Sequence, residues 1–258
     1  MEECLYTQAE YIVKILLING SLRGEHSASL KVARAFVKGI VEEQGAEVTE
    51  VHLKDKRIDH CHGCFVCWKT TPGVCAIHDD MDELRNLVME SDIIVEAFPL
   101  YFFGLPSKLK AFTDRMISYV QEYRGNPGDE ENHRFLHNMR YPELQKKKLV
   151  LVSTCGYEVT DNCYDAVTAQ FDKICGVGKY TTVFAPQGGM LSEEGFADKV
   201  ERYLVKFTEA GKEYAKELCL SKQTVKKLQR PMLGHSTFEM AINMNWDNPD
   251  VGPYGKLV

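Results

Sequence analysis

The chain carries a compact group of cysteines whose spacing suits metal chemistry: Cys61, Cys64, Cys67 and Cys75. The first three recur at every third residue, so a single loop can bring their thiolates onto one inorganic cluster. Gly63 and Gly73 give the backbone the freedom that such a wrap needs. A single zinc ion also takes four ligands, but it usually draws them from two separated pairs. The group therefore predicts a cluster site, with free or redox-active thiols in an ordinary loop as the alternative.

A loop rich in small hydroxyl residues is the second group that suits chemistry. Residues 12–18 form a nearly continuous apolar run, which is typical of a strand buried on both faces of a parallel sheet. The stretch from Ser21 to Ser29 then leads into an amphipathic segment that predicts a helix. The unpaired N–H groups and the positive dipole at a helix start favour an anion there, and an ordinary serine N-cap is the alternative. The loop has neither a GxGxxG nor a GxxxxGK[ST] motif.

Three adjacent aromatic residues, Tyr101, Phe102 and Phe103, lie between Pro99 and Gly104 after another apolar run. Such a sequence suits a solvent loop poorly. It is well suited to form a wall for a planar ring, whose edge can accept hydrogen bonds from nearby backbone N–H groups. The alternative is a buried aromatic cluster under the helix that follows.

Alternating strands and helices must position these groups. Asp80 is the expected N-cap of the second helix, with Glu83 reaching back to it. The alternation predicts an α/β fold with a right-handed, parallel, five-stranded sheet in the doubly wound order 2-1-3-4-5. In that order the loops after strands one, three and four meet at the carboxyl edge of the sheet. The predicted strands cover residues 12–18, 47–53, 91–98, 148–154 and 179–185, and the predicted helices cover residues 29–44, 80 onward, 105–119, 161–174 and 193–220.

Two segments do not follow this alternation. Residues 121–145 are charged and lack periodicity, and the sequence assigns them no role. Residues 221–258 begin with a basic stretch, but residues 238–246 are too apolar for a free tail. We therefore divide the chain into a domain over residues 1–220 and a C-terminal extension over residues 221–258 that packs on the domain or on a partner subunit. We expect a homodimer or a homotetramer.

The loop motifs resemble those of the flavodoxin-like NAD(P)H-dependent FMN reductases. The pattern P-x-Y-x-x-x-x-P-x-x-L-K runs from Pro99 to Lys110, and the family's D-R pair follows at Asp114 and Arg115. The stretch from Gly20 to Ser29 resembles the family's phosphate loop, G-S-x-R-x-x-S/N-S/T, although His26 replaces the more usual small residue. The resemblance extends over residues 12–215, with both motifs in the family's order.

This resemblance implies a flavodoxin-like fold, FMN as cofactor and NAD(P)H as electron donor. It implies that the phosphate loop consists of Ser21, Arg23, His26, Ser27, Ala28 and Ser29. It implies that the ribityl chain and the isoalloxazine contact Pro99, Leu100, Tyr101, Phe102, Phe103 and Gly104. A looser match, after the fourth predicted strand, implies a third flavin loop formed by Thr154, Cys155, Gly156 and Tyr157.

The cysteine spacing resembles that of the iron–sulfur flavoproteins, a branch of the same family that holds a [4Fe–4S] cluster beside FMN. The resemblance implies that Cys61, Cys64, Cys67 and Cys75 are the cluster ligands, with plain thiols still the alternative. Because the segment follows the second predicted strand, we expect it near the same sheet edge as the flavin. The other cysteines are scattered, and we interpret most of them as apolar core residues.

Composition narrows the classes of function. The formal net charge of −6 favours neither nucleic acid nor an anionic membrane as a partner. The sequence has no apolar run of about 18 residues, the length that a membrane span needs. The first four residues are acidic and lack a signal-peptide pattern, so we expect a cytoplasmic protein. Nine cysteines in a reducing compartment indicate metal, redox or core roles more than a disulfide framework.

Three classes of function remain open. The leading hypothesis is an FMN oxidoreductase that takes electrons from NAD(P)H and passes them to a small molecule, a quinone or a protein. The sequence singles out no catalytic acid or base. The second class is an electron-transfer module that works between ferredoxin-like partners. The third is a metal-binding regulatory protein with a flavodoxin-like shell and no flavin, which an absorbance spectrum would distinguish from the other two.

Overall fold

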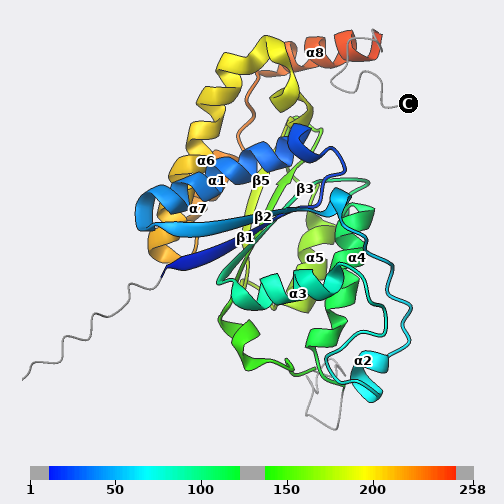
Figure 1. Ribbon diagram of the computed structural model, residues 1–258. Coiled ribbons are helices and arrows are strands. Elements are labelled where there is room, and N and C mark those ends of the chain that lie inside the picture. The colour runs from blue at the N-terminus through cyan, green and yellow to red at the C-terminus, as the bar shows by residue number, and fades with distance from the viewer. Residues whose placement is uncertain (1–11, 123–136, 248–258) are drawn as a thin grey trace, which may run out of the picture.

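A parallel sheet covered by helices on both faces forms the centre of the computed structural model, which describes residues 12–122 and 137–247 (Figure 1). All neighbouring strands are parallel and their order is β2-β1-β3-β4-β5, which confirms the predicted fold class and topology. The strands are β1 (Val13–Asn19), β2 (Ala46–His52), β3 (Ile93–Pro99), β4 (Lys148–Thr154) and β5 (Thr181–Ala185).

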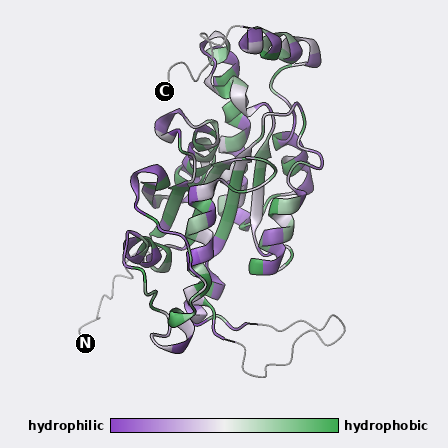
Figure 2. Cartoon of the chain, turned by 90° about the vertical axis from the view of Figure 1, so that its right-hand side faces the viewer, coloured by the Kyte–Doolittle hydropathy of each residue, from purple (hydrophilic) through white to green (hydrophobic). Residues whose placement is uncertain are grey.

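Two helical layers divide the core. Alternate side chains of β1 point to opposite faces, because the side-chain period of a strand is two residues. Ile15 and Leu17 face α1 (Ala28–Gln44) and α6 (Ala197–Glu217). Leu16 and Ile18 face the layer of α3 (Met81–Glu90), α4 (Ser107–Arg115) and α5 (Asp165–Ile174). The central strands are mostly hydrophobic (Figure 2) because both of their faces are covered, and Glu96 in β3 is a buried exception.

Helices α1 and α6 cross at unusually close range through two glycines. A Cβ atom on Gly39 would lie 1.9 Å from the backbone oxygen of Thr208, and a Cβ atom on Gly211 would lie 1.9 Å from that of Phe36. Only glycine fits at either position, so this contact fixes how α6 lies on the sheet.

Several element boundaries differ from the sequence prediction. The helix predicted over residues 105–119 is α4 followed by a 3₁₀ turn, Met116–Tyr119. The Asp80–Glu83 capping box is wrong: the side chain of Asp80 accepts a hydrogen bond from Arg57 N, and Glu83 pairs with Lys56. Asp79 accepts the hydrogen bond from Met81 N instead, at 3.0 Å. Two adjacent aspartates compete for one cap, and contacts distant in sequence decide between them.

The C-terminal extension begins with α7 (Lys222–Leu228), which packs against α6 and β5, and its Leu228 side chain is buried in the core. The second helix, α8 (His235–Asp247), lies at the end of the molecule and contacts the body through Phe238 (Figure 1). Buried Gln187 holds the linker between them: its amide accepts from Met232 N and Leu233 N and donates to Leu233 O. The domain division at residue 220 stays a prediction, and residues 248–258 lie outside the described part.

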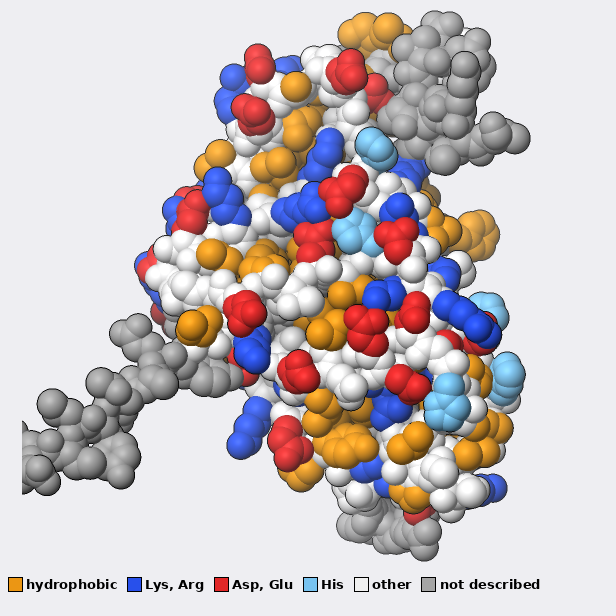
Figure 3. Space-filling view, viewed as in Figure 1, with side chains coloured by type: hydrophobic (Ala, Val, Ile, Leu, Met, Phe, Trp, Pro, Cys, Tyr) orange, Lys and Arg blue, Asp and Glu red, His pale blue; other side chains and the backbone are white. Residues whose placement is uncertain are grey.

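Acidic and basic side chains are interspersed on the face shown in Figure 3. Within residues 12–122 and 137–247, no helix is both long enough and apolar enough to cross a bilayer. The predicted loop over residues 121–145 is described only at its two ends, where Val120 pairs with Met139 and a 3₁₀ turn covers Pro142–Lys146.

Candidate functional site

The hydroxyl loop (residues 20–29) lies between β1 and α1, as predicted. The side chains of Ser21, Ser27 and Ser29 are buried in it, whereas His26 is exposed and Arg23 and Ala28 are partly exposed. The N-cap is Ser27, whose Oγ accepts a hydrogen bond from Leu30 N at 3.2 Å. Helix α1 therefore begins one residue earlier than predicted. The serine cap does not exclude an anion at this helix start, because it occupies only one N–H group of the first turn.

Asn19 shapes this loop, although the sequence analysis treated it only as a strand terminator. Its buried side chain accepts from Ser21 N at 3.1 Å and donates to Gly24 O at 3.1 Å. Gly24 has a φ of +56°, and a Cβ atom there would collide with the side chain of Lys54. The amide of Asn19 thus fixes the turn around which the loop closes.

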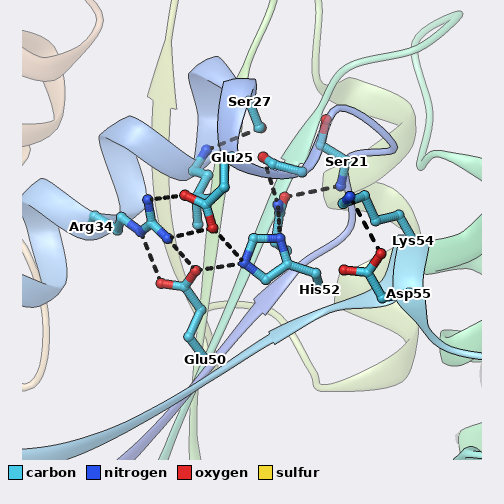
Figure 4. A network of polar contacts seen from close by, with 11 residues as sticks. Ser21, Glu25, Ser27, Arg34, Glu50, His52, Lys54 and Asp55 are labelled. Atoms are coloured by element: carbon cyan, nitrogen blue, oxygen red, sulfur yellow. Dashed lines mark hydrogen bonds and ion pairs between the residues drawn. The ribbon is translucent and has the colours of Figure 1, made fainter.

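An ionic network fastens the outer side of the loop to β2 (Figure 4). Arg34 of α1 makes paired hydrogen bonds with both Glu50 and Glu25, and these bonds raise the pKa of Arg34. His52 lies 2.8 Å from Glu50 and also contacts Asn19. Glu25, Glu50 and His52 cluster closely enough to suggest a metal site. Arg34 already satisfies both carboxylates, so we interpret the network as support for the loop.

The three predicted loops meet at Thr154. Its hydroxyl lies 2.8 Å from the hydroxyl of Ser29, and its carbonyl oxygen accepts from Leu100 N at 2.9 Å. The hydroxyl loop, the aromatic loop and the end of β4 are therefore joined at one point on the carboxyl edge of the sheet. Open α/β sheets bind ligands at this kind of edge.

The aromatic turn (residues 101–104) is exposed and strained. Tyr101 and Gly104 exchange two backbone hydrogen bonds, and Phe102 and Phe103 between them have φ angles of +48° and +62°. Positive φ is unfavourable for bulky residues, and such strain is concentrated at functional sites. Phe102 is 101% exposed, so a buried aromatic cluster is wrong as an interpretation of this turn. The ring of Phe103 stacks on Tyr157 of the third loop with centroids 5.8 Å apart.

Within the third loop, Tyr157 and Gly156 are exposed, but Cys155 is buried. Burial raises the pKa of Cys155 to about 11, so this thiol stays neutral at physiological pH. The sulfurs of Cys155 and Cys163 both donate to the carbonyl oxygen of Val159. These two buried cysteines fit the predicted role of apolar core residues, whereas Cys219 is exposed.

The cysteine loop (residues 59–79) brings its four cysteines together. All four line one cavity, together with Phe65, Ile77 and Arg115. Burial raises the pKa of Cys67, and nearby Cys75, Cys61 and Cys64 each add to the rise. Gly63 and Gly73 have φ angles of +63° and +84°, so both use the freedom that the sequence analysis assigned to them. A short helix, α2 (Val66–Lys69), carries Cys67.

The position of the cysteine loop differs from the prediction. After β2 the chain runs alongside α4: Lys56 O accepts from Lys108 near the start of the helix, and Asp59 O accepts from Arg115 at its end. The cavity thus lies at the C-terminal end of α4, whereas the aromatic turn precedes the N-terminal end. One helix of about 13 Å separates the two sites. The expectation that both lie at the same sheet edge is wrong for a single chain.

Comparison with known proteins agrees with this architecture. The family model described as "Flavodoxin-like fold" matches residues 13–209. The chain belongs to the flavodoxin-like fold family. Among solved structures, an azoreductase from Bacillus anthracis str. Sterne superposes with a TM-score of 0.56 at 18% identity, over 80% of this chain and 100% of that chain. A likeness at this identity concerns the fold alone.

Two curated relatives carry more informative names. An iron–sulfur flavoprotein of Archaeoglobus fulgidus is 41% identical over 107 residues, which are 42% of this chain and 47% of that protein. An FMN-dependent NADH:quinone oxidoreductase of Rhizobium meliloti is 30% identical over 151 residues, which are 56% of this chain and 68% of that protein. The chain spans about half the length of the iron–sulfur flavoproteins that it matches.

Proposed function

We propose that this protein is an FMN-dependent oxidoreductase, which takes electrons from NAD(P)H and passes them to a small-molecule, quinone or protein acceptor. The observation that carries the proposal is the junction of three loops at Thr154, with an exposed aromatic turn on one side and a helix N-terminus on the other. The names of the Rhizobium meliloti and Archaeoglobus fulgidus relatives support the same chemistry.

The loop residues divide the binding work. The first turn of α1 and the Arg23 guanidinium bind the FMN phosphate, because backbone N–H groups and a fixed cation both favour an anion there. Residues 99–104 and 154–157 would hold the ribityl chain and the ring, and Tyr101 and Tyr157 are exposed aromatic side chains in these two loops. The phosphate-loop set still includes His26, although its exposure makes it the least enclosed member. When bound, FMN supplies the exchange of hydride and electrons, while the chain supplies orientation and electrostatics.

The cysteine cavity fits a [4Fe–4S] cluster. Four cysteine thiols line the same cavity, and thiolates are the usual ligands of such clusters. The ligands would be Cys61, Cys64, Cys67 and Cys75. When bound, the cluster supplies one-electron transfer. The chain encloses the site with Phe65, which packs on Trp68 with ring centroids 4.9 Å apart.

An absorbance spectrum after anaerobic purification tests both assignments. We expect bands of oxidised flavin, a broad iron–sulfur shoulder, and bleaching of the flavin bands by NAD(P)H without a partner protein. A protein that neither retains nor rebinds FMN would contradict the proposal. Such a result, with iron or zinc still present, would favour the metal-binding regulatory class instead.

A second candidate is an iron–sulfur flavoprotein that acts as an electron-transfer module between ferredoxin-like partners. The cavity of four cysteines favours it, because a simple flavin reductase does not need one. The two candidates differ in the rate at which NAD(P)H alone reduces the protein. A module stays oxidised with NAD(P)H alone and becomes reduced when reduced ferredoxin is added.

A homodimer or homotetramer also remains a proposal. Helix α8 supports it, because it exposes large apolar side chains that no other described residue buries: Met240, Met244 and Trp246.

A further inference from the structure

Arg115 is the last residue of α4, and its side chain is buried although it lies at a helix end. Its side chain is 1% exposed, and it lines the cavity that the four cysteines share. A guanidinium is rarely buried unless its donors have acceptors. Its hydrogen bonds therefore indicate what the cavity is built to hold.

The two terminal nitrogens of Arg115 hold together the two ends of the cysteine loop, which we call its neck. Nη1 donates to Asp59 O at 2.9 Å and to Asp79 Oδ2 at 2.8 Å, and Nη2 donates to Ile77 O at 2.9 Å and to Asp79 Oδ1 at 3.0 Å. Asp79 also accepts from Asp59 N and Met81 N. Both ends of the loop are thus held by one buried ion pair.

The remaining donor, Nε–H, has no hydrogen-bond partner among the described residues and is fully buried. Asp79 binds the guanidinium at its Nη end, which leaves Nε on a different edge of the planar group. Cys75, a proposed ligand, lines the same cavity as Arg115. Burial lowers the pKa of Arg115, whereas Asp79 and the charge of nearby Cys75 raise it.

We propose that Arg115 is a positioning residue for the metal cluster, with its Nε–H donating to the sulfur of Cys75 when the cluster is bound. The inference rests on the cluster proposed above. Four thiolates give such a cluster a net negative charge, and burial makes that charge costly unless a cation or N–H groups face it. Hydrogen bonds to cluster sulfurs and nearby charge also set its reduction potential. Arg115 supplies both, so it holds the ligand loop and favours the reduced cluster.

The test compares two variants at this residue with a matched control. Arg115→Lys keeps a cation but loses the planar fork. The double variant Arg115→Met with Asp79→Asn removes the buried ion pair as a unit, since removing one partner alone leaves a buried charge unpaired. Arg57→Gln is the control, because Arg57 is an exposed arginine at the same neck. Each protein is reconstituted anaerobically with iron and sulfide, and circular dichroism reports its folding.

We expect both Arg115 variants to lose iron to a chelator about 10-fold faster or more, the usual size of a supporting-residue effect. We expect the double variant to have a lower midpoint potential in an EPR-monitored titration, and Arg57→Gln to match the wild type. If the folded Arg115 variants retain iron like the wild type and keep its potential, the role of Arg115 is overturned, but the cluster proposal is not. A wild type that takes up no iron overturns the cluster proposal and this inference with it.

A measurement on the unmutated protein keeps the test independent of variant folding. In protein labelled with [¹⁵N]arginine, pulsed EPR of the reduced cluster should detect a ¹⁵N hyperfine coupling from the nearby guanidinium. Arg57→Gln should preserve the coupling. A reduced cluster without any ¹⁵N coupling overturns the proposed hydrogen bond.

Discussion

Glu96 is a carboxyl group in the middle of a hydrophobic strand. It lies between Ile18 of β1 and Leu151 of β4, is 6% exposed, and its Oε2 has no hydrogen-bond partner among the described residues. Burial raises the pKa of Glu96 to about 7 from an ordinary value of 4.5. The folded protein therefore keeps this proton at a pH where the unfolded chain has lost it.

This shift makes the stability of the protein depend on pH. The protonated carboxyl contributes about 3 kcal/mol to the free energy of unfolding. This contribution is fully present below the unfolded pKa of 4.5 and is lost as pH rises through the folded pKa of about 7. Glu96→Gln should therefore stabilise the protein at pH 8 by more than at pH 5, as urea unfolding would measure. Glu217→Gln, at an exposed site on α6, is the control. Equal gains at both pH values would contradict the assignment.

Arg23 is the residue on which the phosphate assignment depends most directly. Arg23→Ala should weaken FMN binding by about 1.5–3 kcal/mol, the usual contribution of a hydrogen bond to a charged group, which is roughly a 10- to 100-fold rise in Kd. Fluorescence titration of the apoprotein measures it. Arg202→Ala, at an exposed position on α6, should leave Kd unchanged. Unchanged affinity in Arg23→Ala would show that the phosphate is held elsewhere.

At the scale of elements, the aromatic turn and the first helix should respond differently to loss of a ring. Tyr101 is 42% exposed, whereas Phe36 is fully buried against Tyr214. Tyr101→Ala should weaken FMN binding and change flavin fluorescence with little effect on Tm. Phe36→Ala should lower stability by about 3–5 kcal/mol, because it leaves a cavity. Thermal unfolding of each apoprotein and FMN titration separate the two effects. Similar responses from both variants would mean that the turn is ordinary packing.

The sequence predicted those elements whose signals are local. The apolar runs and their alternation with helices were enough for the strand order, and the loop motifs located three segments that the structure joins at Thr154. The neck of the cysteine loop could not be predicted, because Arg115 and Asp79 are far apart in sequence and pair only after α4 is packed. The same is true of Asp80, which lost the cap to Asp79 through a contact with Arg57.

At the scale of the whole molecule, α8 exposes three large apolar side chains that no other described residue buries: Met240, Met244 and Trp246. If its apolar side chains form the proposed subunit contact, the double variant Met240→Glu with Met244→Glu should shift the protein to monomers. Light scattering at micromolar concentration measures this shift. Val205→Glu, which places a charge at an equally exposed position on α6, should leave assembly unchanged. A monomeric wild type would contradict the prediction.

The closed neck of the cysteine loop has a consequence for the order in which the protein matures. In small zinc domains the metal itself drives folding, and the metal-free chain is unfolded. Here Arg115 and Asp79 join residues 59, 77 and 81 through bonds within the protein. If the loop binds the proposed cluster, these bonds hold its four cysteines on one cavity without help from the metal. The chain would then fold before the cluster is inserted, and iron supply would control the fraction of protein that carries a cluster and not the amount of folded protein.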